Sequence, residues 1–221
     1  MTTQAQIIQS ILRSKCFQLD QLFQFACHQL KKNQHHDLIQ QIRRYEKDLH
    51  NTEVIDPEKA LMYVQTGQYL RETFSYEFPF AGMPNTFYRI EWDIPTAQEI
   101  VERNSRKIKE MPVQDLINGA NVDVTWSKVN KIGYPIQKPI IVVDYPVWRM
   151  QITIDGNHRL AKAYQENPRG TIPAYKLTEE ESFQSMTSDL FRKLYKIHCN
   201  IVAIIAYSNG LIDELDIPYD L

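Results

Sequence analysis

The sequence predicts a protein of the α+β class, in which a helical amino-terminal region precedes a mixed sheet with flanking helices. Three observations lead to this expectation. Apolar residues recur at helical spacing over the first fifty residues, β-branched runs begin near residue 122, and helical patterns separate those runs. With 221 residues, of which 43% are hydrophobic and 24% charged, the chain has the composition of a globular protein that buries a real core.

The region before residue 50 is expected to be helical. Apolar residues recur at helical spacing over residues 7–12, 19–30 and 38–45, while polar and charged residues occupy the other faces. Asp56-Pro57 predicts the start of a further helix that reaches Tyr69, because aspartate is a good N-cap and proline fits the first turn. We therefore expect a small antiparallel helical unit in this region.

A loop is expected between Phe74 and Thr86, because aromatic residues and prolines there break both the helical and the strand period. This loop is the best candidate for a domain boundary. On this interpretation residues 1–85 form a helical amino-terminal region, and residues 86–221 form a second domain with a carboxy-terminal helical extension.

The second domain is expected to open with a strand from Phe87 to Trp92, a helix from Thr96 to Met111 and a short helix from Pro112 to Ile117. β-branched residues then predict two strands, from Pro139 to Val143 and from Met150 to Ile154. A turn signal at Tyr145-Pro146 separates these two strands, so we expect a hairpin.

The second strand of the hairpin leads directly into Asp155-Gly156 and a helix that ends before Gly170. Thr171 to Leu177 is expected to form a further strand. The sequence Thr178-Glu-Glu-Glu predicts a helix start of the capping-box type, and the apolar residues from Phe183 to Ile197 predict that this helix continues.

Charge and cysteine usage disfavour several classes of protein, although they do not exclude nucleic-acid binding. The formal net charge of -2 and the pI near 6.3 do not supply the positive field that non-specific nucleic-acid binding needs. Three cysteines without CxxC spacing fit free thiols better than a disulfide framework or a zinc site. No apolar run approaches the roughly 20 residues of a membrane-spanning helix, and no secretory signal is apparent, so we expect a soluble cytoplasmic protein.

The most concentrated chemical feature is the sequence Asp155-Gly156-Asn157-His158-Arg159, at the predicted junction of strand and helix. A helix start carries unpaired backbone N–H groups and the positive end of the helix dipole, which favour an anion. Gly156 would let a phosphate approach the main chain, Asn157 would cap the helix, and His158 and Arg159 would donate to phosphate oxygens. Asp155 would hold a magnesium ion or orient His158. The spacing leaves a second interpretation open, in which Asp155-Gly156 is a tight turn and Arg159 forms a structural salt bridge.

The residues around this feature resemble the ParB/sulfiredoxin superfamily. The segment from Ile152 to Ala163 is preceded by Pro139-Ile-Ile-Val-Val and followed by Thr171-Ile-Pro-Ala-Tyr. Members of the superfamily show a strand with a "PI.V" start, a second strand ending in a D-G-x-H-R or G-x-x-R signature, a helix and an "IP.." strand. The resemblance covers about Ile132 to Leu177. It implies a ParB/sulfiredoxin-like mixed sheet whose signature binds nucleotide phosphates, with ATP or CTP and Mg²⁺ as cofactors.

Activities in this superfamily diverge, and include CTP binding and hydrolysis, ATP-dependent reduction of cysteine sulfinic acid, phosphorylation of free serine and nuclease activity. Sulfiredoxin chemistry uses a cysteine directly before the His-Arg pair, where this chain has Asn157, so the nucleophile of that reaction is missing. Chromosome-partition proteins add a DNA-binding module, and only about 40 residues follow Leu177. Neither of these two activities fits the sequence well.

The resemblance leads us to expect a nucleotide-binding protein that performs phosphoryl transfer or nucleotide hydrolysis. Residues 156–159 would hold the phosphates, and Asp155 and His158 would be catalytic together with Glu91 or Asp93, which would take a proton from the acceptor hydroxyl. Glu91 and Asp93 equally fit exposed acids at a strand end. Two alternatives remain. One is a non-catalytic ligand-sensing or protein-interaction module whose amino-terminal helices recruit a partner, and the other is a DNA-associated nuclease-like protein.

Overall fold

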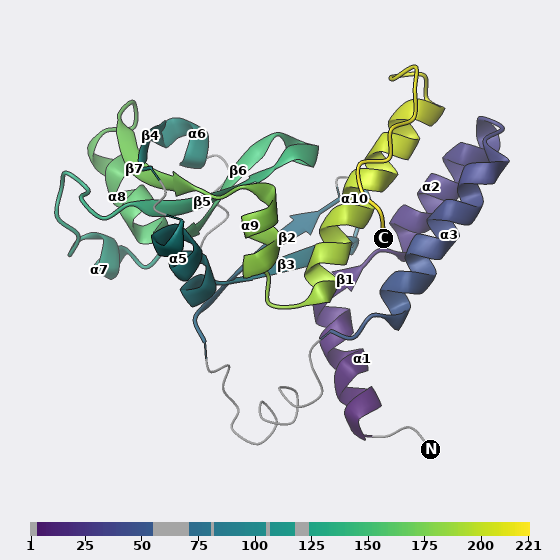
Figure 1. Cartoon of the computed structure of the whole chain (residues 1–221), viewed down its shortest axis with the longest axis horizontal. Coiled ribbons are helices and arrows are strands. Elements are labelled where there is room, and N and C mark those ends of the chain that lie inside the picture. The colour runs from purple at the N-terminus through teal and green to yellow at the C-terminus, as the bar shows by residue number, and fades with distance from the viewer. Residues whose placement is uncertain (1–3, 55–70, 81, 105–106, 118–123) are drawn as a thin grey trace. The chain divides into compact units, whose positions relative to one another are not determined.

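The computed structural model describes residues 4–54, 71–80, 82–104, 107–117 and 124–221, and these form a mixed α and β fold, as predicted (Figure 1). The chain divides into two compact units. Unit 1 consists of Met1–Leu70, Tyr76–Glu91 and Thr187–Leu221, and unit 2 consists of Arg71–Ser75 and Trp92–Met186. Within the described residues, no helix combines the length and the apolar character that a membrane crossing requires.

This division differs from the one expected at residue 85. The carboxy-terminal segment from Thr187 groups with the amino-terminal helices and not with the sheet that follows residue 86. The sequence pattern shows that the helix Asp189–Ser208, α10, is apolar, but it does not show which of two apolar surfaces the helix covers. The grouping of a late helix with early ones therefore has no local sequence signal.

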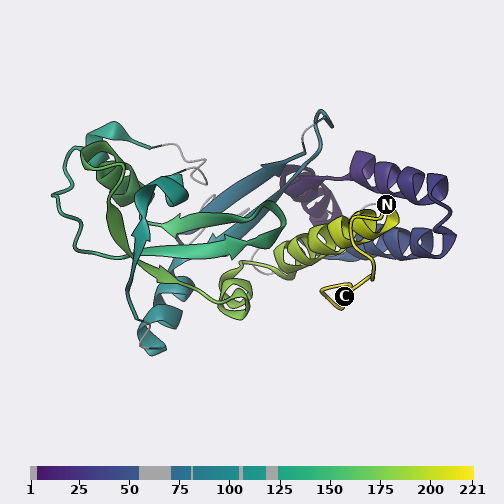
Figure 2. The same ribbon diagram turned by 90° about the horizontal axis from the view of Figure 1, so that it is seen from above.

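Among its described residues, unit 1 is built around the helices α1 (Gln4–Cys16), α2 (Asp20–Lys32), α3 (His36–Asn51) and α10 (Asp189–Ser208). Both views show α10 beside α2 and α3 (Figures 1 and 2). The apolar stripes predicted for α2 and α3 are buried, and they pack with the inward face of α10. Their fully buried members include Phe23, Ala26, Leu30, Ile42, Tyr45, Leu49, Leu194, Ile197, Ile201 and Ile204.

A small sheet belongs mainly to unit 1, and its strands are β1 (Phe17–Gln18), β2 (Thr73–Pro79) and β3 (Phe87–Asp93), in the order β1-β3-β2. The strand predicted at residues 87–92 is confirmed, but the loop predicted from Phe74 is wrong over β2. Burial alternates along the second half of β2, where Tyr76 and Phe78 are buried and their neighbours are exposed. Aromatic side chains at alternate positions suit a half-buried strand, and the proline lies at the strand end, where it is tolerated.

Unit 2 contains a four-stranded sheet of β4 (Lys109–Pro112), β5 (Ile140–Tyr145), β6 (Met150–Asp155) and β7 (Thr171–Lys176). The spatial order is β4-β7-β5-β6, with β5 antiparallel to β6 and parallel to β7. The predicted hairpin is confirmed, and the 3₁₀ turn Pro146–Trp148 connects its strands. The central strand β5 is buried on both faces, which explains its continuous run of β-branched residues.

Short helices complete the described part of unit 2, namely α5 (Ile94–Arg103), α6 (Val113–Ile117), α7 (Trp126–Val129), α8 (Asn157–Glu166) and α9 (Glu179–Ser185). One core cluster joins the sheet to α6 and α8. It contains Met111, Val113, Leu116, Ile140, Val142, Leu160, Ala163, Ile172 and Ala174. The predicted capping box is confirmed, since the Thr178 side chain accepts from the Glu181 N–H and the Glu181 carboxylate accepts from the Thr178 N–H.

Two predicted helices are wrong in extent. The helix expected from Thr96 to Met111 ends at Arg103, and residues 109–112 form β4 because they pair with β7 and place Met111 in the core. The helix expected to continue to Ile197 breaks after Ser185, and α10 starts separately after Ser188. The helix expected from Asp56 to Tyr69 lies outside the described residues.

Candidate functional site

The predicted junction of strand and helix is present in unit 2, and we call residues 153–159 the corner. Strand β6 ends at Asp155, Gly156 adopts a left-handed conformation with φ of 97°, and α8 starts at Asn157. No side chain caps the start of α8. The expectation that Asn157 caps the helix is wrong, because its side-chain amide donates instead to the carbonyl oxygen of Thr153 at 3.0 Å. The first N–H groups of α8 therefore remain available to an anion.

The carboxylate of Asp155 is occupied by partners within unit 2. Its Oδ1 lies 3.3 Å from Nη2 of Arg159, and its Oδ2 accepts a hydrogen bond of 3.0 Å from the side chain of Gln98 in α5. The side chains of Asp155 and Arg159 are 17% and 16% exposed, so the ion pair is largely shielded from water. The salt bridge of the second interpretation is thus present, and the carboxylate neutralises much of the arginine's charge.

The space above Gly156 is filled by the protein itself. A Cβ atom at this position would lie 2.5 Å from Cγ2 of Ile140 and 2.7 Å from Nη2 of Arg159. Only glycine therefore fits here, both for its positive φ and for the close approach of two side chains. The guanidinium of Arg159 covers the surface that the sequence assigned to a phosphate, so a phosphate would have to contact the guanidinium itself.

His158 is oriented by a loop and not by Asp155. Its Nε2 accepts a hydrogen bond of 3.3 Å from the backbone N–H of Thr125, which immediately precedes α7. The contacts of Asp155 are with Gln98 and Arg159, so the expected role of this carboxylate in orienting the imidazole is wrong. Every residue from Asp155 to Arg159 is neither fully buried nor fully exposed, and the corner therefore remains partly open to solvent.

Unpaired buried atoms gather at the corner. In the described part of the chain, five buried side-chain nitrogen or oxygen atoms lack a hydrogen-bond partner, and three of them are Oγ1 of Thr153, Oδ1 of Asn157 and Nε of Arg159. Buried polar atoms without partners are rare in native proteins and often indicate a missing water, ion or ligand. Sequence reasoning missed Thr153. The signal that could have identified this residue is a hydroxyl side chain within an otherwise apolar strand.

The acids proposed on β3 have other partners. Glu91 belongs to unit 1, where its carboxylate accepts a hydrogen bond of 3.0 Å from the hydroxyl of Thr187. Asp93 caps α5 by accepting from the Thr96 N–H at 2.8 Å and pairs with Arg71 at 3.4 Å. The second of these acids is therefore accounted for by a structural role.

Metal-ligand geometry is absent from the described residues, in which no group of three or more His, Cys, Asp or Glu side chains comes together. Asp155 is the residue predicted to hold Mg²⁺, and both of its oxygens already interact with donors. A divalent cation prefers several oxygen ligands and would lie beside the Arg159 cation. The corner therefore fits an anion better than Mg²⁺.

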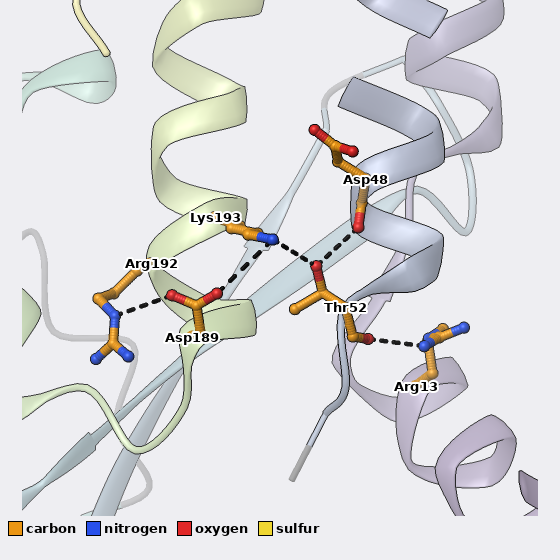
Figure 3. Close-up of polar contacts among 6 residues, drawn as sticks. All are labelled: Arg13, Asp48, Thr52, Asp189, Arg192 and Lys193. Carbon is orange, nitrogen blue, oxygen red and sulfur yellow. Dashed lines mark hydrogen bonds and ion pairs between the residues drawn. The ribbon is translucent and has the colours of Figure 1, made fainter. Parts of the chain in front are cut away.

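A second polar cluster lies in unit 1, where Thr52 connects three helices (Figure 3). Its hydroxyl donates to the carbonyl oxygen of Asp48 at 2.7 Å and accepts from Nζ of Lys193 at 3.0 Å. Its carbonyl oxygen accepts from Nη2 of Arg13 at 2.7 Å. Lys193 also pairs with Asp189 at 3.7 Å. These cations face protein acceptors, so we assign the cluster a structural role.

A buried histidine lies elsewhere in unit 1. His198 in α10 is 4% exposed, and its Nδ1 lies 2.7 Å from the hydroxyl of Tyr88 in β3. The ring of Phe80 also packs against the imidazole. Burial lowers the pKa of His198 from 6.5 to about 4, so the ring is neutral at physiological pH.

Comparisons with protein-family models, with curated proteins and with solved structures return no match to this chain.

Proposed function

We propose that unit 2 is a ParB/sulfiredoxin-like domain whose corner binds a phosphate group of a nucleotide such as ATP or CTP. The observation that carries the proposal is the gathering of three unpaired buried polar atoms, on Thr153, Asn157 and Arg159, beside an uncapped helix start. A phosphate accepts from guanidinium and backbone N–H groups, and a protonated phosphate or sugar hydroxyl donates to an amide oxygen. One nucleotide would thus satisfy donors and acceptors together.

The order of elements supports the same proposal. The hairpin β5–β6, the helix α8 and the strand β7 follow one another as the resemblance implies, and β7 lies parallel to β5. The signature residues fall where the resemblance expects them, between the end of β6 and the first turn of α8. These observations support the site, but they do not select the base of the nucleotide.

Binding without chemistry is the form of the proposal that the geometry favours. Both oxygens of Asp155 already interact with Gln98 or Arg159, and the carboxylate of Glu91 accepts from Thr187. Phosphoryl transfer needs a residue that orients or deprotonates the nucleophile, and usually a metal ion at the phosphate. We therefore favour a nucleotide-sensing module over an enzyme, and a nuclease finds no support in the site.

Calorimetric titration with ATP, CTP, GTP and inorganic phosphate tests the proposal, with and without Mg²⁺. We expect at least one nucleotide to bind, and we expect Arg159→Ala to weaken binding about tenfold or more, because a charge-assisted contact contributes roughly 1.5–3 kcal/mol. Arg89→Ala is the matched control, since Arg89 also forms an ion pair of 3.3 Å, with Glu77 in unit 1. Absence of binding by the wild-type chain at millimolar nucleotide overturns the proposal.

Asp155→Asn separates an anion site from a magnesium site. The variant keeps the shape of the side chain but removes the charge that neutralises Arg159. If the corner binds phosphate directly, affinity without Mg²⁺ rises in this variant, because the guanidinium is released from its ion pair. If Asp155 holds a metal ion, affinity in the presence of Mg²⁺ falls instead. A phosphate-release assay on the wild-type chain then tests hydrolysis, and sustained turnover would contradict a purely binding role.

A further inference from the structure

The carboxy-terminal tail, residues 209–221, follows α10 and turns back along that helix within unit 1 (Figures 1 and 2). From Leu215 onward it forms neither helix nor strand. Its burial alternates, since Leu215, Ile217 and Tyr219 are partly buried while the residues between them are exposed. A period of two is the pattern of an extended peptide that lies on a surface with every second side chain inward.

One buried side chain holds this tail. Asn200 in α10 is 0% exposed, and its amide nitrogen donates to the carbonyl oxygen of Tyr219 at 2.8 Å. Its amide oxygen accepts from the backbone N–H of Tyr219 at 3.1 Å. The second hydrogen of the same nitrogen is directed to the hydroxyl of Tyr45 in α3, at 3.1 Å. The amide therefore binds both backbone groups of one peptide residue, and its nitrogen and its oxygen each have a partner.

The recognition of Tyr219 combines this backbone contact with one aromatic contact. The ring of Tyr195 meets the Tyr219 ring edge-on at 6.0 Å, and Nζ of Lys196 lies 6.0 Å from the same ring's centroid. Because Asn200 contacts only the backbone atoms of Tyr219 in the tail, any extended peptide with a suitable aromatic residue satisfies it. Selectivity would come from the side chains that flank the contact residue.

Side-chain contacts hold the last residues of the tail. Beyond Leu211, no backbone-to-backbone hydrogen bond holds it within the described part of the chain. The tail contains four acidic residues and no basic one, whereas α10 contains Arg192, Lys193 and Lys196. Arg192 and Lys193 pair with Asp189, whereas Lys196 lies over the Tyr219 ring. The tail is thus an acidic, alternately apolar peptide whose backbone is held at Tyr219 by the buried Asn200 amide. A segment held in this way is able to exchange with another of the same chemistry.

We propose that the surface of α3 and α10 around Asn200 is a binding site for an extended peptide of a partner protein, and that the tail occupies it as a competitor in cis. The partner segment carries apolar side chains at alternate positions, an aromatic residue at the position of Tyr219, and acidic residues between them. The tail raises the affinity that a partner needs, because a short tether gives the tail an effective concentration in the millimolar range. The amino-terminal region, through α3, contributes to this partner site.

Fluorescence anisotropy of a labelled peptide with the sequence of residues 215–221 tests the proposal on full-length chains. We expect the Tyr219→Ala chain to bind this peptide about tenfold more tightly than the wild-type chain, because its own tail competes less well. A peptide methylated on the backbone nitrogen at the Tyr219 position lacks the N–H that Asn200 accepts. We expect this peptide to bind about tenfold or more weakly to the Tyr219→Ala chain, because the buried amide oxygen loses its donor.

Three outcomes overturn the proposal. The first is that neither chain binds the peptide. The second is that both chains bind it equally, or that methylation has no effect, because the peptide then binds elsewhere. The third comes from light scattering, where a wild-type dimer that Tyr219→Ala abolishes would identify a second copy of this chain as the occupant. The modified peptide leaves the protein unchanged, so a folding defect in a variant cannot produce the methylation result.

Discussion

Two polar regions of this protein differ in how completely their hydrogen bonds are formed. Around Asn200 in unit 1, both atoms of the side-chain amide have partners, although the residue is fully buried. At the corner in unit 2, Oγ1 of Thr153 and Nε of Arg159 are buried without partners. The atoms compared are buried in both regions, so burial alone does not account for the difference.

The comparison separates buried polar groups that have hydrogen-bond partners from buried polar groups that lack them. A satisfied buried amide contributes to stability, whereas an unpaired buried group costs about 1–3 kcal/mol. A protein that tolerates several such costs at one position is expected to recover them when something binds there. Four substitutions or conditions test this distinction. All three tryptophans lie in unit 2, so fluorescence follows that unit, while far-ultraviolet circular dichroism follows mainly the long helices of unit 1.

Acidification is expected to have the largest effect on stability. The effect arises at His198, which is buried in unit 1. Because burial lowers the pKa of this residue from 6.5 to about 4, the folded state binds its proton less readily than the unfolded state does. Stability is therefore full above pH 6.5 and falls as the pH decreases toward 4, by about 3 kcal/mol in total. Urea unfolding followed by circular dichroism at several pH values measures the slope, and His198→Gln is expected to flatten it. An unchanged slope in the variant would contradict this assignment.

Gly156→Ala is expected to destabilise unit 2 by about 2–3 kcal/mol, because a side chain there opposes the positive φ and collides with Ile140. Gly210→Ala is the control. Gly210 also has a positive φ, of 67°, but a Cβ there meets nothing within 4 Å, so we expect a loss of only about 1 kcal/mol. Urea unfolding measures both, by fluorescence for the first and by circular dichroism for the second. Equal losses would mean that the collision contributes nothing.

Thr52→Val is expected to destabilise unit 1 by about 1–2 kcal/mol. The substitution removes a hydroxyl that donates to the Asp48 carbonyl oxygen and accepts from Lys193, while it preserves the branched shape of the side chain. The main-chain contact with Arg13 remains. Circular dichroism in urea provides the measurement, and a neutral result would show that water replaces these hydrogen bonds without loss.

Thr153→Val is the matched substitution at the corner. We expect it to have the smallest effect on the free energy of unfolding and to cause no loss of stability. Thr153 is 1% exposed and its hydroxyl has no partner, so removal of the hydroxyl should leave stability unchanged or raise it by up to about 1 kcal/mol. Tryptophan fluorescence in urea reports the change. The same variant should bind nucleotide less tightly if the hydroxyl contacts the ligand. A clear loss of stability would instead reveal a buried water on this hydroxyl.

Periodicity predicted most single elements but not their assembly. The stripes of α2 and α3, the hairpin β5–β6 and the capping box at Thr178 follow from local spacing, and each is confirmed. The strand β4 was missed because residues 109–112 have no strong strand pattern of their own and are extended only through pairing with β7. The grouping of α10 with the early helices depends on contacts between residues far apart in the chain, which spacing does not encode.

The sequence predicted where the candidate site lies, but it did not predict whether Arg159 pairs with Asp155 or remains available to a phosphate. The sequence places Asp155 and Arg159 four residues apart across a helix start, and both a salt bridge and a phosphate site are compatible with that spacing. Which one forms depends on Gln98, which reaches the carboxylate from another helix. The role of Asn200 was invisible for the same reason, since its partner Tyr219 lies in a segment without periodicity long enough to predict its contacts.

The discontinuous composition of unit 1 has a consequence for biosynthesis. Its interior requires α10, which begins at residue 189, whereas the helices α2 and α3 that α10 covers are made from residues 20–51. While the ribosome translates the intervening segment, the apolar faces of these early helices lack their final neighbour and are exposed to chaperones. Unit 2 ends at Met186, so its sheet can assemble first, and the early helices reach their native packing only after the last part of the chain emerges.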